Sequence, residues 1–185
     1  MPKYFAFLRA INVGGRTVKM DHLRDIFESL GFSNVETFIA SGNVIFETKS
    51  KDAGALEKLV ERKLKDTLGF EVITFLRSDS ELADIANYKP FPTPQMESAA
   101  ALNIAFLSAP LDDREKKLLS SLKTDIDDFH AHGREVYWLC INKQSESKFS
   151  NAVFERTLGR RATFRGINTV RKMAEKYAAN KGDKP

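Results

Sequence analysis

The stretch VETFIASGNVIFET, residues 35–48, decides the fold that we predict, because it contains two strand-like segments joined by a tight turn. β-branched and aromatic residues are frequent in residues 35–40 and 44–48, and Ser41-Gly42-Asn43 between them is typical of a short hairpin. Such a hairpin, with a strand and a helix before it and a helix and a strand after it, is the centre of a βαββαβ unit.

The flanking residues supply those elements. Residues 3–11 predict a strand, and Leu23, Ile26, Phe27 and Leu30 have the spacing of one helix face, which ends at Gly31. A longer amphipathic helix runs through residues 56–68, and residues 71–77 predict the fourth strand. The order is that of a ferredoxin-like fold.

The same order recurs in the second half of the chain. We predict a strand at 101–108, a helix capped by Asp112 and Glu115, hairpin strands at 127–131 and 135–141, a helix at 150–158 and a strand at 161–164. A last helix begins at Asn168-Thr169. The predicted fold is therefore α+β, with two tandem ferredoxin-like βαββαβ units, antiparallel sheets and an extra C-terminal helix.

Composition shifts divide the chain into three parts. The first unit is expected at residues 1–77, and the second unit with its C-terminal helix at 101–180. Between them, residues 78–100 begin with a short helix, which the capping-box spacing of Ser78 and Glu81 predicts. The alternating prolines at 90, 92 and 94 preclude a helix there and predict a semi-rigid connector.

Several functional classes lack support in the composition. No export signal and no membrane-spanning apolar run is visible, which predicts a soluble, cytoplasmic protein. Cys140 lies in an apolar run and is expected to be a buried, inert strand residue. The three histidines have no zinc-type spacing, so we predict no metal site. No cofactor and no catalytic set is indicated, which leaves open whether the protein is an enzyme.

Topology indicates where a site would lie. In this fold the loop after the first strand, the central hairpin and the turn into the fourth strand meet at one end of the sheet. In the first unit these are residues 12–16, 41–43 and 69–70, which are rich in Gly and Asn. Gly14-Gly15 exposes successive N–H groups that suit an anion, and Arg9, Arg16 and Lys19 add positive charge. The alternative is that Gly-Gly only forms a tight turn.

The C-terminal part of the chain suggests a different partner. From Lys148 onward the chain carries ten Lys and Arg against three acidic residues, although the net charge of the whole chain is only +4. Nucleic-acid binding through Arg160, Arg161 and Arg171 is the alternative that this charge favours. A third alternative is a scaffold that binds another protein.

Two groups of motifs resemble a known family. Residues 7–15 (FLRAINVGG), Lys19-Met20, residues 30–32 (LGF) and residues 39–46 (IASGNVIF) resemble the bacterial domain of unknown function 1697, as do residues 148–173 around Phe154-Glu155 and Asn168-Thr169. The family usually carries Asn-Trp where Gly166-Ile167 stand here. The resemblance implies tandem ferredoxin-like subdomains in cytoplasmic bacterial proteins, with no established activity or cofactor.

Our leading hypothesis is a protein that binds a small phosphate- or carboxylate-bearing ligand. Backbone N–H groups would bind the anion, Arg9 and Lys19 would supply charge, and Asn43 would orient the ligand. Four residues of the C-terminal quarter are predicted to close the site: Arg165, Asn168, Thr169 and Lys172. The complete predicted set adds the following residues: Asn12, Gly14, Gly15, Ser41 and Gly42.

Overall fold

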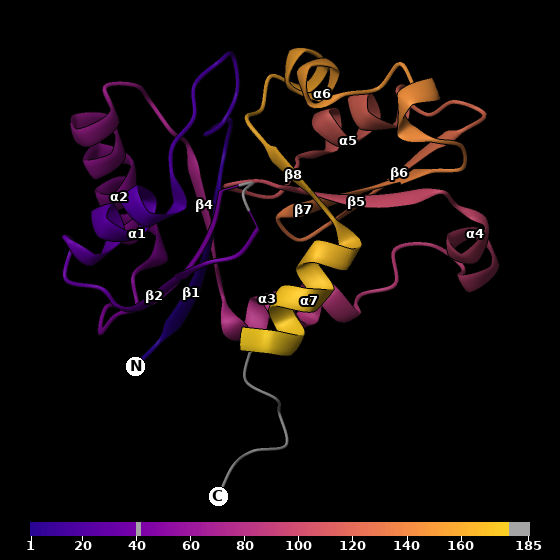
Figure 1. Cartoon of the computed structure of the whole chain (residues 1–185). Helices are drawn as coiled ribbons and strands as arrows, with labels where there is room; N and C mark the ends of the chain where they lie inside the picture. Colours follow the sequence, from indigo (N-terminus) through magenta and orange to yellow (C-terminus); the bar gives the residue numbers. More distant parts are fainter. Residues whose placement is uncertain (40–41, 178–185) are drawn as a thin grey trace, which may run out of the picture. The chain divides into compact units, whose positions relative to one another are not determined.

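The chain is described from a computed structural model that covers residues 1–39 and 42–177 (Figure 1). Its internal contacts divide it into two units, one formed by Met1–Ile85 with the chain from Met173, the other by Ala86–Lys172. Each unit contains one four-stranded sheet in which every neighbouring pair of strands is antiparallel. The predicted α+β fold with two tandem βαββαβ units is confirmed.

The first unit follows the predicted order of elements, with strands arranged β2-β3-β1-β4 in the sheet. Helices α1 and α2 cover one face of this sheet (Figure 1). The elements are β1 (Lys3–Leu8), α1 (Met20–Glu28), β2 (Ser33–Thr37), β3 (Asn43–Glu47), α2 (Ala53–Leu68), β4 (Thr74–Ser78) and α3 (Asp79–Asn87).

Strand β1 is buried on both of its faces. Tyr4, Ala6 and Leu8 belong to the core beneath α1 and α2. Phe5 and Phe7, which point to the opposite face, are also fully buried. This double burial explains why the strand is a continuous apolar run without the alternation of polar and apolar residues that a half-exposed strand shows.

The end of α7 (Ile167–Tyr177) is held by residues of the first unit. The Tyr177 ring packs edge-on against Phe5 and Phe38, and its hydroxyl donates a hydrogen bond to Glu36 at 2.8 Å. Lys3 Nζ donates to the Tyr177 carbonyl at 2.9 Å. The sequence predicts that this whole helix belongs to the second unit, whereas the contacts assign it to the first unit from Met173 onward.

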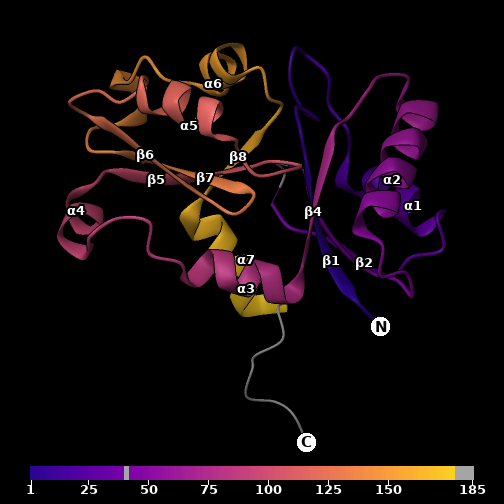
Figure 2. The same ribbon diagram turned by 180° about the vertical axis from the view of Figure 1, so that it is seen from behind.

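The second unit repeats the arrangement, with strands in the order β6-β7-β5-β8. Helices α5 and α6 lie on one face of its sheet (Figure 2). The elements are α4 (Thr93–Ser98), β5 (Ala101–Phe106), α5 (Asp113–Ser120), β6 (Asp127–His132), β7 (Glu135–Cys140), the 3-10 helix η1 (Gln144–Glu146), α6 (Asn151–Leu158) and β8 (Thr163–Gly166), followed by α7.

Local signals for helix ends agree with the structure at two positions and fail at one. Asp112 and Glu115 form the predicted reciprocal capping box, and Ser78 and Glu81 form the other one. The prediction that the connector prolines preclude a helix is wrong, because α4 begins at Thr93. Pro94 lies in its first turn, where the missing N–H has no intrahelical partner to lose.

Candidate functional site

The three loops that topology brings together in the first unit do meet at one end of its sheet. Leu8 N donates to Gly42 O and Arg9 N donates to Ile73 O, both at 2.9 Å. Gly42 has a φ of 79°, and a Cβ at this position would lie 2.8 Å from Ile11 Cγ2. Only glycine fits this close approach. We call this end of the sheet the loop edge.

Gly14 and Gly15 form a tight turn within the loop after β1. Their φ angles are 61° and 79°, and Arg16 N donates to Val13 O at 3.1 Å. Positive φ at both central residues is typical of a type I′ turn. Both glycines are exposed, and no described group accepts a hydrogen bond from their amides. The turn interpretation therefore holds, and both amides belong to exposed residues without a described acceptor.

The two asparagines of the predicted site support the loops. Asn12 Oδ1 accepts a hydrogen bond from Val18 N at 2.8 Å, which closes the loop on itself. The Asn43 side chain is fully buried and donates to Phe38 O at 3.0 Å across the hairpin. A buried amide in this position braces the hairpin and lies away from the surface where a ligand would be oriented. Ser41 lies outside the described residues.

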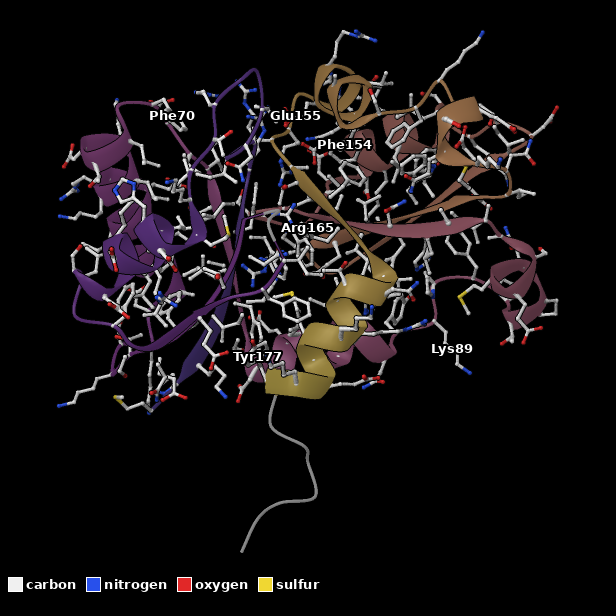
Figure 3. All side chains as sticks on the ribbon, in the orientation of Figure 1. Phe70, Lys89, Phe154, Glu155, Arg165 and Tyr177 are labelled. Atoms are coloured by element: carbon white, nitrogen blue, oxygen red, sulfur yellow. The ribbon has the colours of Figure 1, made fainter. Side chains whose placement is uncertain are left out.

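Positive charge gathers beside these loops, around the start of α1. A shallow pocket of about 440 Å³ is lined by Arg16, Thr17, Lys19, His22 and Phe70, among others. The Arg16 guanidinium lies 4.0 Å from the centre of the Phe70 ring, which holds it at the pocket. Figure 3 shows Phe70 in the segment that joins α2 to β4. Arg9, in contrast, is half-buried and does not line this pocket.

Helix α1 begins at this pocket without a side-chain cap. Lys19 occupies the N-cap position and its side chain makes no capping hydrogen bond. Asp21, the acidic residue of the first turn, pairs with Arg24 at 2.8 Å instead. Phe70 belongs to one of the three loops predicted to meet here. Thr17 and His22 were missed from the sequence, although the position of His22, three residues after Lys19 in the first helical turn, could have indicated it.

The four C-terminal residues of the predicted site occur in the second unit. Arg165, on β8 (Figure 3), is buried and donates to Thr163 Oγ1 at 2.7 Å and to Phe164 O at 2.8 Å. Burial lowers the pKa of Arg165 to about 10, so it remains charged at neutral pH. Asn168 and Thr169 line a separate cavity, and Lys172 is exposed on α7. That these residues close the loop-edge site remains a prediction.

The corresponding edge of the second unit is internally paired. Arg160 donates to Ala109 O at 2.6 Å and pairs with Glu115 at 2.9 Å. Arg161 pairs with Glu155 at 3.5 Å, and Arg171 lines the separate cavity. Two of the three cations proposed for nucleic acid are therefore already engaged by carboxylates within the protein.

Two polar clusters of the second unit brace its sheet. Buried Asp127 accepts hydrogen bonds from Trp138 Nε1 at 2.9 Å and from Ser147 Oγ at 2.8 Å. Burial raises the pKa of the Cys140 thiol, so the predicted inert strand cysteine is protonated at neutral pH. On the β6–β7 hairpin, the Tyr88 hydroxyl lies 2.7 Å from His130 Nε2, and burial lowers the pKa of His130.

Two further findings concern the described residues. Among residues 1–39 and 42–177, no group of three or more His, Cys, Asp or Glu side chains could hold a metal ion. Within the same residues, every helix is too short or too polar to cross a membrane.

The chain is similar to a bacterial protein whose structure has been solved. It shares 27% sequence identity and a TM-score of 0.73 with the conserved bacterial protein SP0830 from Streptococcus pneumoniae, and the similarity covers 94% of this chain and 97% of that one. No curated protein matches the chain. The profile of a family described as a protein of unknown function matches residues 1–137, which includes both N-terminal motifs and ends before residues 148–173. The chain therefore belongs to the DUF1697 family.

Proposed function

We propose that this protein binds a small phosphate- or carboxylate-bearing ligand at the loop edge of its first unit. The observation that carries the proposal is the start of α1, which has no side-chain cap and opens into the pocket lined by Arg16, Lys19 and His22. The first N–H groups of a helix lack intrahelical partners and carry partial positive charge. An anion at this position would accept hydrogen bonds from those groups.

The side chains around the helix start favour the same ligand charge. Arg16 and Lys19 are both exposed, and the described residues lining the pocket include no carboxylate. Arg16 is oriented by its contact with Phe70, so it loses less conformational freedom when it binds an anion than a free arginine would. A planar guanidinium can then contact two oxygens of one phosphate or carboxylate group.

The glycine turn adds backbone donors next to this pocket. Gly14 and Gly15 are exposed and their amides have no described acceptor, and Arg16, which follows them, lines the pocket. Neighbouring backbone N–H groups in a turn are a common anion-binding arrangement. Asn12 and Asn43 contribute by holding the two loops in place, through their hydrogen bonds to Val18 and Phe38.

The experiment is a calorimetric and thermal-shift titration with inorganic phosphate and pyrophosphate. We expect both anions to raise Tm, and the double variant Arg16→Gln/Lys19→Gln to bind at least about tenfold more weakly, because two charge-assisted hydrogen bonds are lost. The matched control is Arg62→Gln/Lys51→Gln, which removes the same charges at exposed positions of the same unit, outside the pocket.

Two outcomes would contradict the proposal. The first is that neither anion shifts Tm in wild-type protein at millimolar concentration. The second is that the control variant loses as much affinity as the pocket variant, which would mean that net charge, and not this pocket, attracts the anions.

A further inference from the structure

The second unit contains a larger cavity, of about 730 Å³, at the start of β5 and the end of β8. The 3-10 helix η1, α4 and the first turns of α7 complete its walls. This volume lies within the range of pockets that bind small metabolites. None of its lining residues lines the loop-edge pocket around Arg16 and Lys19.

One buried polar group in the cavity wall has no partner. The side-chain nitrogen of Asn103, in β5, is buried and no hydrogen-bond acceptor reaches it in the described chain. Leaving a buried donor unpaired is unfavourable, so native proteins rarely retain one without a reason. A ligand oxygen in the cavity would satisfy this nitrogen.

The neighbouring strand places no side chain beside Asn103. Gly166 is the residue opposite Asn103 in the β5–β8 pair, and it lines the same cavity. A Cβ at position 166 would meet only Asn103 Oδ1, at 3.8 Å, so a glycine is not required there by the backbone. The missing side chain leaves space in the cavity wall next to the oxygen of the Asn103 side chain.

The remaining wall combines positive charge with apolar surface. Lys143 and Arg171 line the cavity, against one carboxylate from Glu97. Met96 and Ile167 provide apolar contact area. Asn168 and Thr169 belong to the first turn of α7, an eleven-residue helix whose first N–H groups add further donors.

We propose that this cavity is a second binding site, for a small molecule that consists of an anionic group and an apolar or planar part. The carboxylate or phosphate group accepts hydrogen bonds from the Asn103 amide and the start of α7, near Arg171. The apolar or planar part packs against Met96 and Ile167. This site and the loop edge lie in different units and are occupied independently.

The test uses the full chain with adenosine 5′-monophosphate, hexanoate and inorganic phosphate as calorimetric probes. We expect the monophosphate or hexanoate to bind wild-type protein at least about tenfold more tightly than inorganic phosphate does, since only these probes cover the apolar wall. Asn103→Leu should weaken that binding about tenfold or more, since it removes a hydrogen bond to a charged group. Arg171→Gln should weaken it severalfold, and Arg114→Gln, an exposed control in α5, should not.

Two further measurements separate this site from the loop edge and from a structural role of Asn103. Trp138, the only tryptophan, pairs with Asn103 across β5 and β7, so its fluorescence should follow occupancy of the cavity. The variant Arg16→Gln/Lys19→Gln should leave the fluorescence titration unchanged. Without ligand, Asn103→Leu should melt at or above the wild-type temperature, because it removes an unpaired donor.

Three outcomes would overturn the inference: no binding of the monophosphate or hexanoate, equal binding by wild type and the Asn103 and Arg171 variants, or a lower Tm for Asn103→Leu without ligand. The last result would show that the amide is satisfied within the fold. Because the loop-edge proposal is tested with other variants and with inorganic anions, either proposal can fail while the other stands.

Discussion

The two units have the same strand order, but the hydrogen bonding at their corresponding loop edges differs. In the second unit, Asp112 and Glu115 cap α5, and Arg160 joins the preceding loop to Glu115. In the first unit, α1 begins at Lys19 with no side-chain cap. The second edge satisfies its own backbone donors, whereas the first leaves donors exposed beside positive charge. The shared topology thus gives each unit an equivalent edge. The residues of the loops determine whether the backbone donors at that edge are available to a ligand.

Substitution of the hairpin glycines tests this difference between the units and should have the largest effect. Gly42→Ala should destabilise the protein by about 3 kcal/mol, since it combines left-handed strain with overpacking against Ile11. Gly133→Ala should cost only about 1 kcal/mol, because its Cβ would meet one carboxylate oxygen of Glu135, at 3.2 Å, and no backbone atom. Urea denaturation measures both values. Equal losses would show that the two hairpins are under the same constraint.

The helix caps provide the second test. Asp112→Ala should cost about 1 kcal/mol, because it removes the side chain that accepts from Glu115 N at 2.7 Å. Lys19→Ala should be neutral within about 0.5 kcal/mol, because no capping bond is lost. Comparison of urea midpoints for the two variants checks this. A loss at Lys19 as large as that at Asp112 would contradict the difference between the edges.

Giving α1 the missing cap should produce a smaller effect of opposite sign. Lys19→Ser should stabilise the protein by about 0.5–1 kcal/mol, since a serine hydroxyl can accept from the first helical turn. It should also reduce the response of Tm to phosphate, because a cation and exposed donors are removed together. If stability rises while phosphate binding is unchanged, the ligand does not use this helix start. Lys51→Ser is the matched control.

The smallest expected effect is a pH dependence that belongs to the second unit. The pKa of His130 is lowered from its usual value of 6.5, first by burial and then by His132. Because its pKa is higher in the unfolded chain, His130 binds a proton more readily there than in the folded protein. The neutral, buried His130 therefore contributes its full stability above pH 6.5, and this stability is lost as the pH falls through the lowered pKa. His130→Gln should flatten the pH dependence of the urea midpoint below pH 6.5. An unchanged slope would show that other groups cause the pH dependence.

Local sequence rules predicted much of the fold. Helical and strand periodicity identified both βαββαβ units, and the spacing of Asp112 and Glu115 identified a capping box that the structure contains. Connectivity then placed the loops after β1 and between β2 and β3 at one edge, where Leu8 bonds Gly42. These features depend on neighbours within a few residues or on strand order, both of which can be read from a sequence.

Tertiary contacts decided the rest. Asn43 and Arg165 were predicted to meet a ligand, but both are buried, and burial depends on residues distant in sequence. The partners of Tyr177, Phe5 and Phe38, lie more than a hundred residues before it, so no local pattern could assign the end of α7 to the first unit. The sequence alone determined the two units and their loop edge. Only the folded chain decided which polar groups at that edge remain exposed, because a hydrogen-bonding group is available to a ligand only where packing has neither buried nor paired it.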